Sequence, residues 1–579
     1  MGARRRIASG FWRWSGALPL LVVVGLFLIA PVLVLLARAV LTPAGLAQWG
    51  HLLTDAPTRQ ALATSVALGA VCAVISTLIG TPLAWLISRA LPGQRAAWLG
   101  LFNVAAHFGG IGLAFAIVAT LGTFGLVTLA LQSLGIALDP PARGSFVALV
   151  LTYEYANVPL FVLLVVPGMG LLRDEWREAA RVAGAGRWQF WRRIGMPVLL
   201  PFILAGALLS FTWSIGVYGI AFGLTGDSPT QPVRLLTLQI GQMLADDAVN
   251  GQSRAAVLSV VLIVLALLAL GGYRWLTRRG LRWFRASAVE GSWQHERSQQ
   301  RERPVWPERL LRGGVALYLG VPVLAVALYS VATRWTDHIL PDGYTADHWL
   351  AIATDARARG ALLSSLALAT LTTVIVVGLT VPAAYWARVV NPRIRIVLEL
   401  SAAIPFALPF LVIGLALLEF SGVVAPQIQG SWPLLVAGYV TVTFPFVYWA
   451  IDGAMVAAGV ERLAEAAAAS GASRTQTIWR VVLPNIRSGL VAGAMLAFAT
   501  VIGEFALGSV VATSVTTLPV WMADALHDRN SGNLGPLAAM TLLTFAVLFV
   551  LSWLVARANR RGQVTAAATE TGLGELGIS

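Results

Sequence analysis

The chain has 579 residues, of which 57% are hydrophobic and 12% charged, and its mean hydropathy is +0.76. A soluble domain is nearer half apolar and a quarter charged, so this composition excludes an ordinary soluble protein and favours the bilayer as solvent. The net charge of +14 comes from arginine, because the chain contains no lysine. Most arginines fall on one side of the predicted spans, which is the positive-inside pattern and not the single basic surface of a nucleic-acid-binding protein.

Apolar segments long enough to cross a bilayer recur along the chain and predict an all-α, polytopic membrane protein with about 12 transmembrane helices. The first segment follows Arg4–Arg6 and is about 20 residues long, so we expect a retained helix and not a signal peptide. A shorter apolar run at 124–138 is expected at the outer surface. The predicted spans are 17–39, 60–89, 98–121, 144–168, 198–222 and 253–274, then 312–333, 360–389, 394–420, 431–452, 488–512 and 535–558.

These spans divide the chain into two transmembrane domains. We predict the first domain at 1–274, a cytoplasmic linker at 275–311, the second domain at 312–560 and a cytoplasmic tail at 561–579. Both ends and the linker carry arginine, while the predicted outer loops carry mostly aspartate. Both termini are therefore expected to be cytoplasmic.

The two domains are copies of each other. Six spans return the chain to its starting side, so the copies have the same orientation and are parallel repeats, with a solute pathway expected between them. The matching positions are 65–68 with 365–368 and Pro82 with Pro382, at an offset of 300 residues, and Tyr153 with Tyr439 and Pro159 with Pro445, at an offset of 286 residues.

One motif occurs twice, each time in the predicted cytoplasmic loop after the fourth span of a copy. Its spacing predicts a thin alanine-rich helix, a glycine turn and a second short helix before the next span begins at proline. A single alanine-rich surface loop would give such a pattern by chance, but a matched pair at a constant offset of 287 residues is hard to obtain that way. The first copy is Glu178, Ala179, Ala180, Gly184, Arg187 and Pro197; the second is Glu465, Ala466, Ala467, Gly471, Arg474 and Pro484.

This motif resembles the EAA loop of binding-protein-dependent ABC importer permeases of the type I, maltose-like class, here as a fused double transmembrane domain. The resemblance extends over essentially the whole chain. It implies that the tips at 184–190 and 471–477 dock onto a cytoplasmic ABC ATPase, present in two copies. It also implies an extracytoplasmic solute-binding protein, a multi-pass location in the bacterial inner membrane surrounded by lipid, and no nucleic-acid partner.

The chain itself is not expected to bind a cofactor or a metal. The phosphate-binding loop of P-loop ATPases needs a lysine on the phosphates, and no lysine is present. ATP would therefore be used by the partner subunit, and the chain would be a transport subunit and not an enzyme. The single cysteine, Cys72, lies in an apolar run and is expected to be a small core residue.

Polar and acidic residues inside the predicted spans give a second set of candidates. We expect the substrate pathway to include Tyr153, Glu154, Asn157 and Glu504, because intramembrane acids are costly and usually face a cavity or a partner. The alternative is that these acids form structural hydrogen bonds to the backbone or to arginine.

The substrate is the least constrained part of the prediction. Weak similarity around Gly503 and Leu224 to spermidine/putrescine-type permeases, together with acidic outer loops, favours a polyamine or another small cation. Ferric iron, thiamine or another small solute remains the alternative within the same family. A secondary ion-coupled transporter would instead show inverted repeats and buried ionisable pairs, and a membrane-embedded enzyme would need a catalytic cluster that this sequence does not offer.

Overall fold

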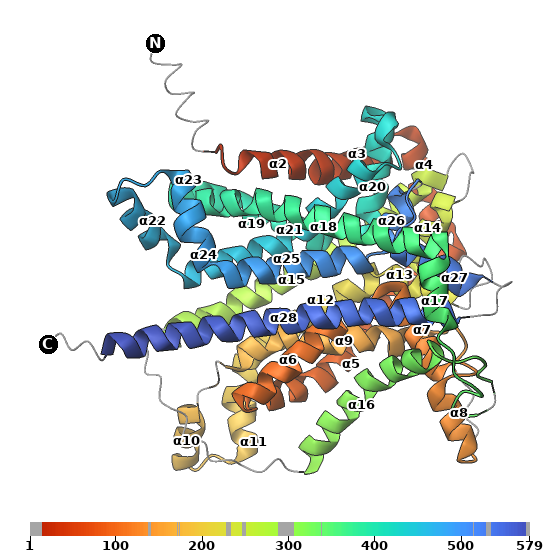
Figure 1. The fold of residues 1–579 in the computed structure, drawn as a ribbon, viewed down its shortest axis with the longest axis horizontal. Helices are drawn as coiled ribbons and strands as arrows, with labels where there is room; N and C mark the ends of the chain where they lie inside the picture. The colour runs from red at the N-terminus through yellow and green to blue at the C-terminus, as the bar shows by residue number, and fades with distance from the viewer. Residues whose placement is uncertain are drawn as a thin grey trace.

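The computed structural model of the chain describes residues 14–136, 141–170, 172, 174–226, 233–245, 251–287, 306–336, 338–512, 514–528 and 534–574. Over these ranges the chain forms helices, and a single isolated bridge joins Ala332 to Tyr344. The long helices run side by side, and short helices collect at both ends of the bundle (Figure 1).

Ten helices among the described residues are long and apolar enough to cross a membrane, or twelve if each of two sharply bent helix pairs counts as one span. The prediction of an all-α, polytopic membrane protein is therefore confirmed. The third span differs from the prediction. The sequence favours 98–121, whereas the helical stretch that is long and apolar enough to cross a membrane is Gly110–Ser133. The stretch includes a short helix, α8 (Leu126–Ser133), which lies at the right-hand end of the bundle in Figure 1.

Over the described residues, the first half of the chain contains fourteen α-helices, α2 to α15, and two π-helices, η1 and η2. In chain order they are α2 (Leu18–Val24), η1 (Gly25–Ile29), α3 (Ala30–Leu41), α4 (Pro43–Thr54), α5 (Ala56–Ser88), α6 (Pro92–His107), α7 (Gly110–Leu121), α8, α9 (Phe146–Met169), α10 (Asp174–Val182), α11 (Arg187–Phe190), η2 (Trp191–Gly195), α12 (Met196–Gly216), α13 (Gly219–Thr225), α14 (Leu236–Ala245) and α15 (Gly251–Ser287).

The second half repeats this order. Its helices are α16 (Trp306–Tyr329), α17 (Asp347–Thr354), α18 (Ala356–Tyr385), η3 (Trp386–Val390), α19 (Pro392–Ala407), α20 (Phe410–Val424), η4 (Pro426–Ile428), α21 (Trp432–Ala457), α22 (Val460–Ala469), α23 (Arg474–Gln476), η5 (Thr477–Val482), α24 (Leu483–Asn485), α25 (Arg487–Gly503), α26 (Ala506–Val511), α27 (Leu518–His527) and α28 (Gly535–Gly574).

The same hydrogen bond recurs in both halves. In the first half the Ser65 hydroxyl accepts from the Leu236 backbone N–H at 2.9 Å, and in the second the Ser365 hydroxyl accepts from Leu518 N–H at 2.7 Å. Each bond holds a short helix of the right-hand end, α14 or α27, against the second span of its own half. The two equivalent serines, 300 residues apart, therefore make the same contact between helices in their own halves.

The third and fifth spans predicted for each half are each interrupted by a break in the helix. The breaks separate α6 from α7, α12 from α13, α19 from α20 and α25 from α26. Non-helical backbone at membrane depth is tolerated only where protein or a water-filled cavity surrounds it. The four breaks therefore have to face the interior of the bundle, where the two halves meet.

The first span of each half packs against the other half. Helix α3 lies along α20 and α16 lies along α7. The exchange is stabilised by polar contacts: Arg38 on α3 forms an ion pair with Glu419 on α20, and the Tyr155 hydroxyl donates to the Leu319 carbonyl at 2.9 Å. Each half is consequently completed by a helix from the other.

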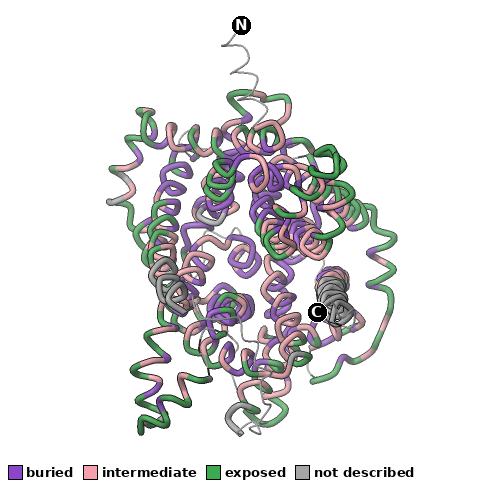
Figure 2. The backbone as a smooth tube through the Cα atoms, turned by 90° about the vertical axis from the view of Figure 1, so that its left-hand side faces the viewer, coloured by how far each residue is buried: buried purple, intermediate pink, exposed green. Residues whose placement is uncertain are grey.

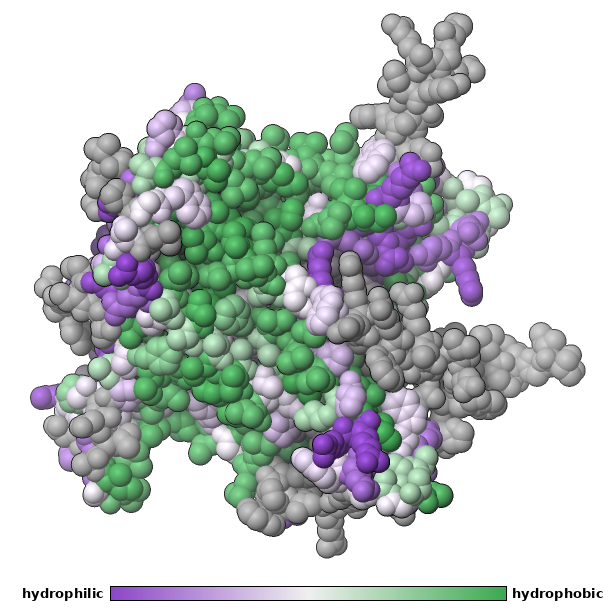
Figure 3. Space-filling model, turned by 180° about the vertical axis from the view of Figure 1, so that it is seen from behind, coloured by the Kyte–Doolittle hydropathy of each residue, from purple (hydrophilic) through white to green (hydrophobic). Residues whose placement is uncertain are grey.

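Exposed apolar side chains form the outside of the bundle. Leu78 is 70% exposed, Leu268 69% and Leu317 66%, which would be unfavourable in water but suits a surface covered by lipid. A broad band of hydrophobic side chains crosses the molecule between more hydrophilic ends (Figure 3). Viewed along the bundle, buried residues gather toward the inside of the ring of helices (Figure 2).

Candidate functional site

Two loops at the left-hand end of the bundle contain the repeated motif (Figure 1). In the first loop Glu178 and Ala179 are exposed on α10 while Ala180 is buried. In the second, Glu465 and Ala466 are exposed on α22. The short side chains keep each helix narrow, and the exposed glutamates leave its outer face free for contact.

The two glycine turns have the same geometry. Gly184 has φ +76° and Gly471 has φ +78°, a region that side chains with a Cβ rarely adopt. In the first turn Ala185 N–H donates to Ala180 O at 2.8 Å, and in the second Ala472 N–H donates to Ala467 O at 3.0 Å. This bond closes a Schellman turn, which ends α10 and α22 identically.

A second short helix follows each turn and leads into the fifth span. Pro197 lies in the first turn of α12, where a missing N–H costs little. Pro484 lies in α24, just before the chain bends by 81° into α25. The second copy also has a capping box, since Ser473 and Gln476 exchange side-chain to backbone hydrogen bonds.

Ion pairs between side chains hold the second loop to the bundle. Arg388 binds both carboxylate oxygens of Asp452 at 2.7 Å and reaches Glu461 on α22 at 3.0 Å. Partial burial raises the pKa of Glu461, but a backbone hydrogen bond and the Arg388 guanidinium outweigh this, and the pKa falls below its usual value. Arg474 adds a cation–π contact, 5.7 Å from the centre of the Trp386 ring.

Aromatic rings anchor the first loop instead. Trp191 packs edge-on against Trp85 with ring centroids 4.9 Å apart, and Arg89 lies 5.2 Å from the Trp85 ring centre. The side chain of Arg187, predicted at this loop, lies outside the described residues. The two loops therefore share their turn but differ in what holds them to the bundle.

The four residues predicted for the substrate pathway are divided between the halves. In the first half, Glu154 accepts from the Ser76 hydroxyl at 2.7 Å, Asn157 donates to Ser214 at 2.8 Å, and Tyr153 donates to the Val217 carbonyl at 3.3 Å. In the second half both carboxylate oxygens of Glu504 accept from the Leu507 N–H. Glu504 thus caps the start of α26.

Aromatic side chains from the two halves meet at the breaks in the fifth spans. Tyr218 stacks on Phe505 with ring centroids 5.5 Å apart and planes at 22°. Phe222 lies 5.0 Å from Phe505 and 5.4 Å from His527, again between ring centroids. We call Tyr218, Phe222, Phe505 and His527 the aromatic closure, because they fill the contact between α13 and the chain around α26 and α27.

The sequence contained a signal for this closure that was not used. Tyr218 and Phe505 are separated by 287 residues, the same offset that relates the two loop motifs. Each residue directly precedes the short helix after a break. Extending the loop alignment into the fifth span would have paired these two rings.

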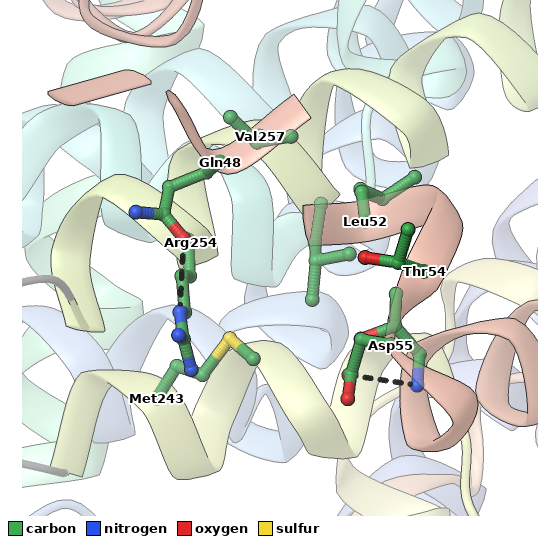
Figure 4. Close-up of a pocket in the computed structure, with 9 residues that line it drawn as sticks. Gln48, Leu52, Thr54, Asp55, Met243, Arg254 and Val257 are labelled. Atoms are coloured by element: carbon green, nitrogen blue, oxygen red, sulfur yellow. Dashed lines mark hydrogen bonds between the residues drawn. The ribbon is translucent and has the colours of Figure 1, made fainter. Parts of the chain in front are cut away.

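A pocket of about 280 Å³ opens between α4, α5, α14 and α15 of the first half. Arg254 donates to Gln48 at 3.0 Å on one side, and the Asp55 carboxylate caps α5 on the other (Figure 4). Gln48 is matched in the second half by His348, which is buried and bonds the Ala332 carbonyl. The pocket is lined by Gln48, Leu52, Thr54, Asp55, Thr58, Met243, Arg254, Val257 and Leu258.

Comparison with known proteins relates this chain to a family of membrane transport components. Residues 377–563 match the model of the family described as binding-protein-dependent transport system inner membrane component. A probable molybdenum ABC transporter permease protein of Haloferax volcanii is 32% identical over 246 residues, which are 39% of this chain and 84% of that protein.

Two relatives from Escherichia coli (strain K12) show the same pattern of partial coverage. The molybdenum transport system permease protein is 28% identical over 232 residues, 39% of this chain and 96% of the relative. The sulfate transport system permease protein is 36% identical over 178 residues, 28% of this chain and 61% of the relative. The molybdenum permease therefore aligns over nearly its full length, and the aligned region covers about two-fifths of this chain.

Proposed function

The chain belongs to the family of inner membrane components of binding-protein-dependent transport systems, and we propose that it contains two fused permease domains that form one solute pathway. As an ABC importer permease it is a multi-pass protein of the inner membrane and a transport subunit. The proposal adds that the pathway runs between the two halves, that both termini are cytoplasmic, and that each half has one docking loop for an ATPase.

The observation that carries the proposal is the pair of loops with one turn geometry. A docking element must present the same shape to each copy of a symmetric partner. The turns at Gly184 and Gly471 have nearly equal φ values and equivalent hydrogen bonds. The loops also share the spacing of their glutamate, glycine and proline residues, so the matched sequence and the matched shape agree.

Apolar side chains at the loops support docking onto a protein. Val182 is 91% exposed and Trp188 is 75% exposed in the first loop. Large exposed apolar groups outside the lipid-facing band are unfavourable unless a partner covers them. The family works with an ATPase and a solute-binding protein; we propose that two ATPase copies cover these loops and use the ATP.

Deleting both tips, 184–190 and 471–477, is expected to abolish co-purification of the ATPase subunit and ATP-driven uptake. A milder variant carries Val182→Asp with Ala469→Asp, which places a charge on each exposed docking face without disturbing buried residues. It should also lose the ATPase while the permease stays folded. Pull-down of the ATPase from solubilised membranes and uptake into vesicles measure both effects.

The matched control for this test is Leu134→Asp, which changes a side chain that is 74% exposed next to α8 at the other end of the bundle. This variant should retain the ATPase. If the double variant retains it too, or if uptake continues on an ion gradient without an ATPase, the docking proposal is wrong.

For the substrate we propose a small inorganic oxyanion of the sulfate class. The polyamine expected from the sequence finds no support among the relatives, which are named for molybdenum and sulfate transport. Glu504, a predicted pathway residue, gives a cationic substrate no added support, because its carboxylate accepts hydrogen bonds from backbone N–H groups. A carboxylate bonded in this way is a helix cap and does not need a cationic solute as partner.

Uptake of radiolabelled sulfate by the chain, assembled with its ATPase and solute-binding protein, tests this assignment. Excess unlabelled sulfate or molybdate should compete, whereas putrescine, thiamine and ferric iron should not. Transport of putrescine, thiamine or iron in place of sulfate would overturn the oxyanion proposal and leave the docking proposal intact.

A further inference from the structure

A cluster of polar side chains lies inside the first half, where α5, α9 and α12 pack against one another. All of its members are at most 4% exposed. Cys72 is fully buried on α5, one helical turn before Ser76. The members are Cys72, Ser76, Glu154, Asn157, Ser210 and Ser214.

The hydrogen bonding of this cluster is incomplete. Glu154 Oε1 and Asn157 Oδ1 are buried and have no donor. They lie three residues apart on α9, so they share one face of the helix. Each unsatisfied buried group costs stability. A proton bound at Glu154 Oε1 would remove an uncompensated buried charge.

Among the described residues, no cation compensates a charge on Glu154. The ion pairs of the described residues do not include it, and no basic side chain acts on it electrostatically. The titratable groups around it are the Cys72 thiol on α5, the Tyr318 hydroxyl on α16 and the tyrosines beside it on α9. The three tyrosine hydroxyls, at 153, 155 and 318, all donate to backbone carbonyls. An isolated buried carboxylate is far costlier than the neutral acid.

The second half shows that the fold does not need an acid here. Its corresponding layer, built from α18, α21 and α25, has Val440 in place of Glu154 and Thr443 in place of Asn157. Ser76 is matched by Val376, and Ser210 and Ser214 by Ala497 and Val501. These residues are also buried. The same three-helix packing is therefore achieved without an acid at this position, and the acid in the first half has another role.

We propose that Glu154 is a proton-binding site, with a proton from water held on its buried, unpartnered Oε1. The site touches the break in the fifth span. Ser214 lies within one turn of Gly216, where α12 ends, and Tyr153 bonds the Val217 carbonyl just beyond it. Loss of the proton leaves an uncompensated carboxylate in the cluster that contacts the break before α13, and α13 lies on the Tyr218 and Phe222 side of the aromatic closure.

Infrared difference spectroscopy on the purified, lipid-reconstituted transporter tests the site directly. The spectrum of the wild type minus that of Glu154→Gln should contain the carbonyl band of a protonated carboxylic acid at neutral pH. Glu419→Gln is the matched control, since Glu419 is also buried in the bundle but paired with Arg38. Its difference spectrum should contain a carboxylate band instead. Absence of the acid band in the Glu154 spectrum would overturn the proposal.

Thermal stability as a function of pH gives an independent readout. An unfolded glutamate is ionised at neutral pH, so the native state binds one more proton than the unfolded chain, and stability falls as pH rises. The folding equilibrium should lose about tenfold per pH unit while the proton is retained. Glu154→Gln, a neutral isostere, should lack this component, and Glu419→Gln should keep it.

The site could hold a sodium ion only at the expense of the proton, and the two are distinguishable. Replacing sodium with choline should leave the melting temperature of the wild type unchanged. Sodium-dependent stabilisation that disappears in Glu154→Gln would overturn the proton assignment, as would identical pH profiles of the wild type and Glu154→Gln. Neither result bears on the docking loops or the substrate.

Discussion

Oxidation of a Gly219→Cys, Phe505→Cys double variant is expected to reduce uptake to background, and a reductant should restore it. A Cβ placed on Gly219 would lie 3.1 Å from Phe505 Cβ. Disulfides have Cβ–Cβ distances of about 3.5–4.5 Å, so a shift of a few tenths of an ångström permits the bond. It would join the two halves at the aromatic closure, and a pathway between them could not open.

The chain is well suited to this experiment. Its single cysteine, Cys72, is fully buried, so background cross-linking is small. Each single variant should be insensitive to oxidation. A disulfide from Ala450→Cys with Gly493→Cys, whose Cβ positions would lie 3.3 Å apart within the second half, should form without stopping uptake. If the Gly219–Phe505 cross-link forms and uptake continues, the solute does not pass the closure.

Arg388→Met should destabilise the second half by about 3–5 kcal/mol, because it leaves Asp452 with an uncompensated charge in a largely buried setting. The Arg388 side chain is 6% exposed and Asp452 15%. The substitution also releases Glu461, so α22 and the second loop should become susceptible to proteolysis. Chemical unfolding in detergent micelles measures the first effect, and limited proteolysis locates the second.

Arg395→Met is the control for this prediction. Arg395 pairs with Glu399 at 2.8 Å, but both side chains are about half exposed, and exposed i,i+4 pairs contribute about 0.3–0.5 kcal/mol. The first loop offers an internal comparison, because Ser88 occupies the position of Arg388 there and that loop should be cut no faster. Equal unfolding midpoints for the two methionine variants would contradict the prediction.

The helical spans and the repeated loops were predictable from sequence because each has a local signature. An apolar run of sufficient length predicts a span wherever it packs, and the glycines at 184 and 471 predict a turn from backbone conformation alone. The spacing of the repeat then related the loops to each other. None of these inferences required knowledge of which helix neighbours which.

The interruptions of the spans and the roles of the acids depend on neighbours. The break between α25 and α26 falls at Glu504 within a hydrophobic window, since the exposed backbone is enclosed by other helices and not by water. Hydropathy cannot detect such a break. The sequence likewise placed Glu504 in a spanning segment but could not show that its carboxylate turns back to the Leu507 N–H.

The exchange of first spans sets the order in which the molecule can be completed during synthesis. Arg38 and Glu419 are 381 residues apart in the chain. At about 5–20 residues per second, translation takes on the order of 20–80 s to cover that distance. The first helix therefore waits in the bilayer without its partner, and its arginine must be kept near the polar boundary or shielded by the insertion machinery until α20 arrives.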